Sequence, residues 1–358
     1  MRDAHHAHCV IDISASASTS LAARRPMSGF RHDVLALGNA IVDVIATAED
    51  DFLVSHAIQK GGMTLIDEAR AEALYKAMGP GQVVSGGSAA NTAAGIASFG
   101  GKAAFIGKVR DDQLGKLYRH DLVSLGVAFD TADATEGPTT ARCLIAVTPD
   151  GQRSMSTYLG ACQGLTRLDV NAEQVRSSQI VYLEGYLWDP SAAKDAFRKA
   201  SEIAHAAGSK VALTLSDSFC VDRWRDEFLE LIRNGVVDII FANEHELKSL
   251  FQTGDIDTAV KAIRNETILA VVTRSEHGAM AVTRGETVSV PAYPVERVVD
   301  TTGAGDLFAA GFLFGLANGR DHRDCLRLGA LAAAEIISHI GARPHISLKQ
   351  LAAQNGLA

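Results

Sequence analysis

The stretch Val299–Leu316, VDTTGAGDLFAAGFLFGL, places two threonines, two glycines and one aspartate in front of an almost wholly apolar segment. Gly303 and Gly305 flank Ala304 and permit a tight turn that brings the backbone close to a ligand, because glycine adopts dihedral angles that other residues avoid. The apolar helix that follows begins with unpaired N–H groups and a partial positive charge. The stretch therefore predicts an anion-binding turn at the start of a buried helix, with Asp306 beside it.

An anion-binding turn beside a carboxylate suits phosphoryl transfer to an alcohol. Backbone amides stabilise charge on the transferred phosphate, while the carboxylate orients the attacking hydroxyl and accepts its proton. The helix dipole is expected to hold Asp306 in its ionised form. A simpler interpretation is that Asp306 only caps a buried helix, since aspartate is a favoured N-cap residue. The motif by itself does not separate a catalytic base from a helix cap.

Length and composition indicate a globular protein with one large domain or two smaller ones. The 358 residues are 47% hydrophobic and 21% charged, and 34 basic residues against 42 acidic ones give a net charge of −8. This acidic balance argues against a nucleic-acid-binding or membrane-surface protein, and no apolar run reaches the roughly 18 residues that span a bilayer. Five cysteines without a CxxC pair predict reduced thiols and a cytoplasmic location.

The first 30 residues differ in composition from the rest of the chain. They are rich in Ala, Ser and Arg, and three histidines fall within the first eight positions. We predict that residues 1–30 form a disordered or non-native N-terminal tail outside the folded domain at 31–358, and that Met27 is a candidate for the biological start.

From residue 33 onward, apolar segments with the character of buried strands alternate with segments of helical periodicity. Such alternation predicts a mostly parallel sheet with helices on both faces. Ligands of such sheets bind beyond the carboxyl ends of the strands, which directs attention to Asn39, Gly185, Ser216, Asn243 and Arg274. Strands are expected at 33–46 with a break at Gly38-Asn39, 103–109, 179–185, 210–216, 236–243 and 268–274, and helices at 91–99, 111–126, 191–207, 222–233, 304–318 and 321–338.

Two segments do not fit this alternation. Residues 140–159 have the alternating pattern of a β-hairpin around the turn at 149–151, and residues 44–64 show no strand–helix pattern. Both suit a small β layer inserted in the main domain, to which we assign residues 44–64 and 134–160. A layer of this kind is expected to act as a lid that excludes water from the transferred phosphoryl group.

Competing phosphate-binding motifs are missing. The sequence has no GxxxxGK[ST] P-loop, and GNAIVD at 38–43 lacks the GxGxxG spacing of dinucleotide-binding proteins. No DFG segment of a protein kinase is present. These observations argue against a P-loop protein and a protein kinase, and they weaken the case for a dinucleotide-dependent oxidoreductase.

Two long motifs resemble those of a known family. DTTGAGDLFAAGFL at 300–313 resembles the C-terminal motif of the ribokinase-like carbohydrate kinases, the PfkB family, and SGGSAANTAAGIASFGGKAAFIGKVRDDQLG at 85–115 resembles the N-terminal motif. The resemblance extends over residues 31–345. It implies the ribokinase-like α/β fold with a mostly parallel central sheet, helices on both faces and a small β lid. Within the family, GNAIVDV at 38–44 and RSMSTYLGAC at 153–162 are most similar to the adenosine kinases.

The resemblance implies roles for residues around the acceptor. Asp306 is implied to be the catalytic base, with Gly303, Ala304 and Gly305 as the anion hole. Asp43 is implied to bind two vicinal ribose hydroxyls, for which a carboxylate has enough lone pairs. Further implied acceptor-binding residues are Asn39, Gly86, Gly87, Asn91, the stacking aromatic Tyr186, and Arg153, which would reach over the phosphates from the small β layer. Alternatively, the glycines form a simple turn, Asn91 caps a helix, Tyr186 packs in the core and Arg153 is solvated.

The resemblance also implies a nucleotide and metal site. ATP is the implied phosphoryl donor, Mg²⁺ the implied cofactor and K⁺ a candidate activator. Glu246 is implied to act on Mg²⁺ through water, and Asp300 and Thr302 resemble residues that flank a potassium site. The segment NEHE at 243–246 also fits a helix cap. The residues implied to bind ATP are Asn243, Thr273, Arg274, Gly278, Gly303 and Gly305.

We therefore expect an enzyme that transfers a phosphoryl group from ATP to the ribose 5′-hydroxyl of adenosine, giving AMP and ADP. A sugar kinase of the same family, of the ribokinase or fructokinase type, is the alternative, because only the inner acceptor pocket separates the two. An alternative of another class is a nucleotide-binding regulator without catalysis. The expected partners are ATP and adenosine or a related nucleoside or sugar, with neither nucleic acid nor membrane. Both a monomer and a dimer fit the sequence.

Overall fold

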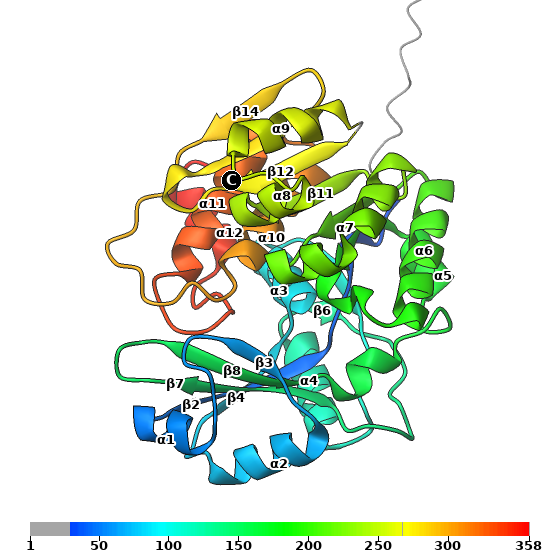
Figure 1. Ribbon diagram of the computed structural model, residues 1–358. Helices are drawn as coiled ribbons and strands as arrows, with labels where there is room; N and C mark the ends of the chain where they lie inside the picture. The colour runs from blue at the N-terminus through cyan, green and yellow to red at the C-terminus, as the bar shows by residue number, and fades with distance from the viewer. Residues whose placement is uncertain (1–28, 267, 358) are drawn as a thin grey trace, which may run out of the picture.

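The computed structural model describes residues 29–266 and 268–357, so the predictions for residues 1–28, including Met27, lie outside the described part. Within that part, the chain forms a nine-stranded sheet and a second, five-stranded sheet. The second sheet lies at one end of the molecule together with α1 (Asp50–Ser55) and α2 (Glu68–Ala77), and the larger sheet with its helices makes up the rest (Figure 1).

The main sheet confirms the predicted α/β fold. Its strands are β1 (His32–Leu37), β5 (Ala103–Ile106), β6 (Val127–Ala128), β9 (Ser178–Glu184), β10 (Lys210–Thr214), β11 (Ile239–Asn243), β12 (Leu269–Thr273), β13 (Ala279–Val282) and β14 (Thr287–Val290). In space they follow the order β14-β13-β12-β11-β10-β9-β1-β5-β6. The seven strands from β12 to β6 are parallel, and β13 and β14 add an antiparallel edge. These two edge strands were not predicted, because each is only four residues long.

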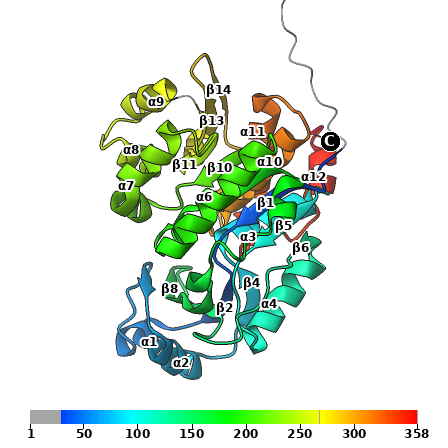
Figure 2. The same ribbon diagram turned by 90° about the vertical axis from the view of Figure 1, so that its right-hand side faces the viewer.

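Helices cover both faces of the main sheet. They are α3 (Ser88–Ser98), α4 (Gln113–Ser124), α5 (Ala172–Arg176), α6 (Ser191–Ala206), α7 (Ser218–Arg233), α8 (Glu244–Leu250), α9 (Ile256–Asn265), α10 (Ala304–Ala317), α11 (His322–Ile336) and α12 (Leu348–Gln354). Along β1, Val34 and Ala36 belong to one core cluster and Leu35 and Leu37 to the other, since successive side chains of a strand point to opposite faces. Figure 2 shows α7 and α8 on one side of the strands and α11 and α12 on the other.

The second sheet differs in extent from the predicted β layer. Its strands are β2 (Ile41–Thr47), β3 (Met63–Leu65), β4 (Gln82–Gly86), β7 (Ala141–Val147) and β8 (Arg153–Tyr158), in the order β3-β8-β7-β2-β4. The hairpin expected at 140–159 is present as β7 and β8. Strand β4, however, lies outside the two segments assigned to the layer. On β2, Val44 packs with Leu74 of α2 and Leu144 of β7, so Asp43 lies on the opposite face of the sheet.

The chain passes between the two sheets at the carboxyl end of β1. Only Gly38, Asn39 and Ala40 separate β1 from β2, at the break that the sequence predicted. The first return passage is at Gly87, which joins β4 to α3 and has a φ angle of +92°, a conformation that suits glycine. These two passages meet, because a Cβ atom on Gly87 would lie 2.2 Å from the carbonyl oxygen of Asn39, and they do so at the edge of the main sheet where ligands of parallel sheets bind.

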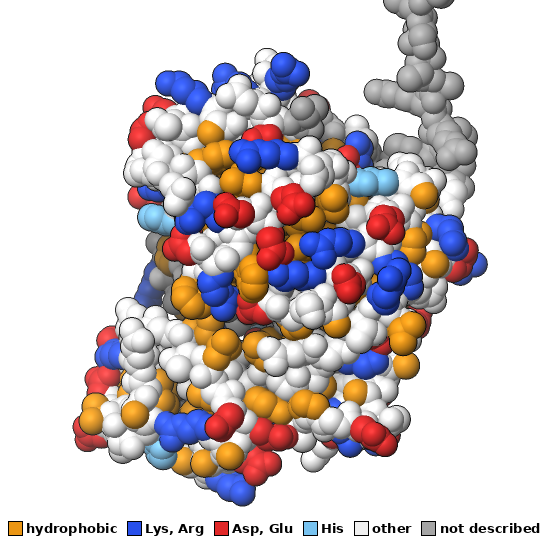
Figure 3. Space-filling view, turned by 45° about the vertical axis from the view of Figure 1, so that its right-hand side comes forward, with side chains coloured by type: hydrophobic (Ala, Val, Ile, Leu, Met, Phe, Trp, Pro, Cys, Tyr) orange, Lys and Arg blue, Asp and Glu red, His pale blue; other side chains and the backbone are white. Residues whose placement is uncertain are grey.

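The surface carries mixed charge. On the face shown in Figure 3, basic and acidic side chains are interspersed, without an extended patch of either sign. Among the described residues, no helix has both the length and the apolar character that crossing a membrane requires.

Candidate active site

The stretch at 299–316 forms the turn and helix that it predicts. Gly303 has a φ angle of +79° directly before α10, and a Cβ atom on it would lie 2.9 Å from Cβ of Ala342. A Cβ atom on Gly305 would meet no atom within 4 Å, so this side of the turn has room for a ligand. The amide of Ala304 donates to the carbonyl of Thr301 at 3.2 Å, whereas the described residues provide no acceptor for the amides of Gly303 and Gly305. These two amides are free to bind an anion.

Asp306 lies in the first turn of α10 and faces the N-terminus of α3. Ser88 Oγ donates to Asp306 Oδ1 at 2.6 Å, and Asn91 Nδ2 donates to Oδ2 at 2.8 Å. Burial raises the pKa of Asp306, while these two hydrogen bonds and the positive charge of Arg343 lower it. The net shift is upward, opposite to the effect expected from the helix dipole alone. A raised pKa makes the ionised carboxylate a stronger base.

Asp43 approaches the same region from the second sheet. A Cβ atom on Gly86 would lie 2.3 Å from Asp43 Oδ2, so the glycine backbone lies directly against this carboxylate. Burial raises the pKa of Asp43 to about 7; the charges of Arg343 and Arg153 oppose this shift, and Asp306 adds to it. No described side chain forms a hydrogen bond or ion pair with the Asp43 carboxylate. Its oxygens are therefore available to a ligand with two neighbouring hydroxyl groups.

Glu184, the last residue of β9, is a buried site residue that was not predicted from the sequence. Its Oε1 atom accepts hydrogen bonds from Asn39 Nδ2 at 2.7 Å and Asn39 N at 3.3 Å, and its Oε2 atom accepts one from the amide of Ala89 at 2.8 Å. Burial raises the pKa of Glu184 to about 7, against the effect of these bonds. Glu184 thus holds Asn39 and the start of α3 together. The rule that ligands bind beyond strand ends had selected Gly185, the residue directly after Glu184.

Tyr186 follows in a 3-10 turn, η2 (Gly185–Trp188), and lies against Ser216. Its backbone N–H donates to Ser216 Oγ at 3.0 Å, and its hydroxyl donates to the Ser216 carbonyl at 3.3 Å. Ser216 has a φ angle of +74°, an uncommon conformation for a residue with a side chain. Tyr186 is 37% exposed, which leaves room for a stacking contact with a base.

Asn243 and Glu246 form a reciprocal cap at the start of α8. Glu246 Oε2 accepts from the backbone N–H of Asn243 at 2.9 Å, Glu246 N donates to Asn243 Oδ1 at 2.9 Å, and Asn243 Nδ2 donates to Glu246 Oε1. The helix cap that the sequence allowed is therefore present. Burial raises the pKa of Glu246 to about 7.

The few carboxylate oxygens around Glu246 fit a metal ion that is held mainly by the phosphates of a bound nucleotide. Within residues 29–266 and 268–357, no group of three or more His, Cys, Asp or Glu side chains is arranged to hold a metal. In the described part of the chain, Glu246 has only Asp217 as a neighbouring carboxylate that raises its pKa, and so small a set suits Mg²⁺, which keeps several waters and binds phosphate oxygens. The residues present are thus compatible with a Mg²⁺–triphosphate complex and not with a metal cage made by the protein.

Thr273, Arg274 and Gly278 lie together at the end of β12. The amide of Arg274 donates to the carbonyl of Gly278 at 2.8 Å. Gly278 has a φ angle of +82°, and a Cβ atom on it would lie 2.1 Å from the carbonyl oxygen of Val290, so only glycine fits. Thr273 is the register partner of Asn243 on the neighbouring strand. The predicted ATP-binding residues of β11 and β12 therefore share one sheet edge.

Arg153 connects the second sheet to the loop before α10. Its Nη2 atom lies 2.7 Å from Asp300 Oδ2, and the two side chains are 9% and 7% exposed. Asp300 also accepts hydrogen bonds from Thr302 N at 3.0 Å, Thr302 Oγ1 at 2.8 Å and Gly341 N at 2.9 Å. Both oxygens of the Asp300 carboxylate therefore have partners. A K⁺ ion beside this carboxylate would be repelled by the positive charge of Arg153. Arg153 was predicted to reach over the phosphates. Its guanidinium group pairs with Asp300, in the loop that carries the anion-binding turn.

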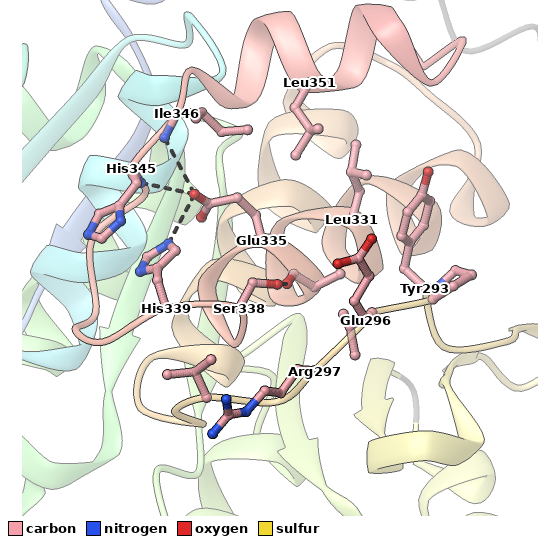
Figure 4. Close-up of a pocket in the computed structure, with 14 residues that line it drawn as sticks. Tyr293, Glu296, Arg297, Leu331, Glu335, Ser338, His339, His345, Ile346 and Leu351 are labelled. Atoms are coloured by element: carbon pink, nitrogen blue, oxygen red, sulfur yellow. Dashed lines mark hydrogen bonds and ion pairs between the residues drawn. The ribbon is translucent and has the colours of Figure 1, made fainter. Parts of the chain in front are cut away.

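A pocket of about 610 Å³ lies beside this loop, bordered by α11 and α12 (Figure 4). Tyr293 and Leu331 contribute to an apolar wall, while Glu335 accepts a hydrogen bond from His339 Nε2 at 3.0 Å on another side. Val299 also lines the pocket, at the start of the stretch that leads to the anion-binding turn. A largely apolar pocket of this size with a few polar groups suits a small aromatic ligand. It was not predicted, because its lining comes from three separate segments.

Comparison with known proteins finds relatives that span nearly the whole described chain. Residues 31–348 match a family model described as pfkB family carbohydrate kinase. The solved structure of adenosine kinase from Sinorhizobium meliloti is 54% identical, with a TM-score of 0.86, and the match covers 91% of this chain and 99% of that one. A probable sugar kinase protein from Rhizobium etli CFN 42 is 52% identical, with a TM-score of 0.87, and covers 92% of this chain and 100% of that one. A curated relative, 5-dehydro-2-deoxygluconokinase from Shouchella clausii, is 28% identical over 322 residues, which are 87% of this chain and 91% of that protein.

Proposed function

Because the chain belongs to the pfkB family of carbohydrate kinases, we propose that it transfers a phosphoryl group from ATP to the ribose 5′-hydroxyl of adenosine, giving AMP and ADP. The observation that carries the proposal is the position of Asp306. Its carboxylate is held by Ser88 and Asn91 beside a turn with two free amides. The similarity to an adenosine kinase over nearly the full length of both chains supports adenosine as the acceptor.

In the proposed reaction, residues from both sheets bind the acceptor. Asp43 accepts hydrogen bonds from the two vicinal ribose hydroxyls, and Gly86 and Gly87 let the backbone approach the sugar. Asn91 Oδ1 is buried and has no partner among the described residues, so it is free to accept a hydrogen bond from the acceptor. Tyr186 stacks on the adenine. These contacts leave the 5′-hydroxyl next to Asp306.

Asp306 then orients the 5′-hydroxyl and accepts its proton as the new oxygen–phosphorus bond forms. The bond between the γ-phosphorus and the bridging oxygen of ATP breaks, and ADP leaves. The amides of Gly303 and Gly305 stabilise the charge on the transferred group. Closure of the second sheet, with Arg153 at its edge, keeps water from competing as acceptor.

In the proposed complex, the phosphoryl donor ATP lies along the carboxyl ends of β11 and β12. Asn243, Thr273, Arg274 and Gly278 lie there to contact the triphosphate and its ribose, and the pocket lined by Tyr293 accommodates the adenine base of ATP. Mg²⁺, when bound to the triphosphate, neutralises part of its charge, and Glu246 would contact it through water.

A sugar kinase is the second candidate function, because Asp43 and the unpartnered Oδ1 atom of Asn91 suit the hydroxyls of a free sugar as well as those of a ribose. The relatives described as a probable sugar kinase and as 5-dehydro-2-deoxygluconokinase support the same candidate. The two functions share donor and base and differ only in the acceptor.

The test is ADP release by the full-length protein with ATP and Mg²⁺, measured against a panel of nucleosides and free sugars. We expect turnover with adenosine to exceed that with ribose, fructose and 5-dehydro-2-deoxygluconate, and ³¹P NMR of the product to show a 5′-phosphate. Preference for a free sugar over every nucleoside would replace the first candidate with the second. Nucleotide binding without ADP release for any acceptor would indicate a regulator instead of an enzyme.

A further inference from the structure

Arg343, in the loop between α11 and α12, lies under the proposed reaction site without a part in the reaction described above. We propose that Arg343 is a positioning residue of this site: one guanidinium fixes both ends of the segment 85–90 and supplies the positive charge that balances Asp43 and Asp306. The kinetic part of this proposal rests on the proposed function.

The guanidinium group of Arg343 connects the end of β4 to the first turn of α3. Arg343 Nε and Nη2 donate to the Ser85 carbonyl at 3.3 and 3.0 Å, and Nη2 also donates to Ser85 Oγ at 3.1 Å. Nη1 donates to the carbonyl of Ala90 at 2.7 Å. Ser85 N donates in turn to Asp121 Oδ2 at 2.9 Å, which ties the same point to α4. A planar fork with several donors can hold two backbone segments at once, as a lysine cannot.

The segment between these anchors carries much of the proposed acceptor site. Gly86 lies against Asp43, and Gly87 makes the left-handed turn into α3. Ser88, in the middle of the segment, donates to Asp306. Asn91, which also donates to Asp306, follows Ala90 directly. A shift of this segment would therefore alter both contacts of Asp306 and the backbone beside Asp43.

The charge of Arg343 is not neutralised by a direct partner. Its hydrogen bonds go to two carbonyls and one hydroxyl, and it forms no ion pair with a described residue. Its charge instead lowers the pKa of Asp43 and of Asp306, in both cases against the effect of burial. Arg343 thus favours the ionised form of the two carboxylates.

The other titratable and charged groups of this region come from every element around it. They are Asp43 of β2, Tyr118 and Asp121 of α4, Cys143 of β7, Arg153 of β8, Cys162 of η1 (Gly160–Gly164), Tyr182 and Glu184 of β9, and Asp306 of α10. Arg153 is the other cation in this set, and it is paired with Asp300. Arg343 is therefore the cation that balances the carboxylates without a salt-bridge partner of its own.

The test compares two variants of the full-length protein. Arg343→Gln keeps a hydrogen-bonding amide but removes the charge, and Arg343→Lys keeps the charge but removes the planar fork. The value of kcat/KM for the acceptor is measured from about pH 5.5 to about pH 9. We expect activity to fall at low pH, because the base must be ionised. In Arg343→Gln we expect this acid limb to move upward by at least about half a pH unit. In Arg343→Lys we expect a lower kcat at every pH without that movement.

Arg119→Gln is the matched control. Arg119 of α4 also donates to two backbone carbonyls, those of Phe129 and Thr131. Unlike Arg343 it forms an ion pair, with Asp133, and it is not among the groups that act on Asp43 or Asp306. We expect this variant to lose stability without movement of the acid limb. If Arg343→Gln behaves like Arg119→Gln, Arg343 has only a structural role and the proposal is wrong.

Two further measurements do not depend on catalysis. Titration of the Asp306 carboxyl by ¹³C NMR, with the signal assigned through its loss in Asp306→Asn, should show an upward shift in Arg343→Gln. That shift would support the proposal even if the wild-type protein phosphorylates no acceptor, a result that would overturn the proposed function alone. At about pH 9, where Asp43 is ionised, the double variant Arg343→Gln/Asp43→Asn should regain stability relative to Arg343→Gln, because it removes the negative charge that has lost its balancing cation; no recovery at this pH would contradict the charge balance.

Discussion

Arg153 of β8 and Asp300 of the loop before α10 form an almost fully buried ion pair with a separation of 2.7 Å. The pair joins the second sheet to the segment that carries Gly303 and Asp306. Because a buried charge is costly without its partner, the two elements are coupled. The pair therefore offers a way to measure how firmly the second sheet is attached to the anion-binding turn.

Arg153→Met should destabilise the protein by about 3 kcal/mol, because it leaves the carboxylate of Asp300 buried without its cation. The double variant Arg153→Met/Asp300→Asn should be less destabilised than the sum of its single variants. Urea unfolding of the four proteins measures this coupling. Additive effects of the two substitutions would mean that the ion pair does not hold the sheet and the loop together.

The second sheet is proposed to close over the bound acceptor. If it does, amide hydrogen exchange in residues 140–159 should slow when adenosine is added, since closure protects the β7–β8 hairpin. Mass spectrometry of peptides from this hairpin gives the rates, with peptides from α6 as the internal control. Equal rates with and without adenosine would argue against a lid.

Asp306→Asn should reduce turnover by a factor of about 10² to 10⁴, the usual contribution of a positioned general base. The substitution preserves the shape of the side chain, so the affinity for ATP measured by calorimetry should change little. Turnover within a factor of two of the wild-type value would show that Asp306 is not the base.

Gly303→Ala and Gly305→Ala should have opposite effects on stability. Gly303 has a left-handed conformation and no room for a Cβ atom, so alanine there should destabilise the fold. Gly305 lies in the helix with open space around its Cα atom, so alanine there should stabilise it by roughly 0.5 to 1 kcal/mol. The added methyl group would, however, occupy the space for the phosphate.

Thermal unfolding and the KM for ATP separate these two effects. For Gly305→Ala we expect a raised Tm together with a raised KM, and for Gly303→Ala a lowered Tm. An unchanged KM in the stable Gly305→Ala protein would mean that the phosphate does not bind at this turn.

The stability of the ligand-free protein should decrease from about pH 5 to about pH 8. Burial raises the pKa of Asp43, Glu184 and Glu246 to about 7, above the value of roughly 4 in the unfolded chain. Between these values the folded state binds more protons than the unfolded state. Their contribution to stability is therefore complete below about pH 4 and is lost as the pH rises through about 7.

Urea unfolding at several pH values checks this dependence. Asp43→Asn should flatten the decrease, because it removes one of the three groups, whereas Asp195→Asn on the exposed surface of α6 should leave it unchanged. A stability that rises across this range in the wild-type protein would contradict the buried, protonated state of these carboxyls.

Local sequence patterns were sufficient for the fold class and for most strands of the main sheet. The apolar runs at 179–185 and 210–216 predicted strands, and β9 and β10 are found there. The motifs at 85–115 and 300–313 predicted the family, which the match over residues 31–348 confirms. The extent of the second sheet was not predicted correctly, because strand β4 takes its place in the sheet only through pairing with β2.

The residues that complete the candidate site gave no local signal. Ser88 contacts Asp306 across 218 positions of sequence, and Arg343 contacts Ser85 across 258. Glu184 is the last residue of β9, whereas the rule that ligands bind beyond strand ends selected the next residue, Gly185. A serine at a helix start, an arginine in a loop and a glutamate at a strand end are all common, and only their contacts distinguish them.

The sequence by itself determined the alternation of strands and helices and the glycine turn before Asp306, because periodicity and backbone freedom belong to short segments. The tertiary structure alone decided the raised pKa values of Asp43, Glu184 and Asp306 and the pairing of Arg153 with Asp300. Burial and the nearness of charges arise only when distant segments meet, so no stretch of sequence contains them.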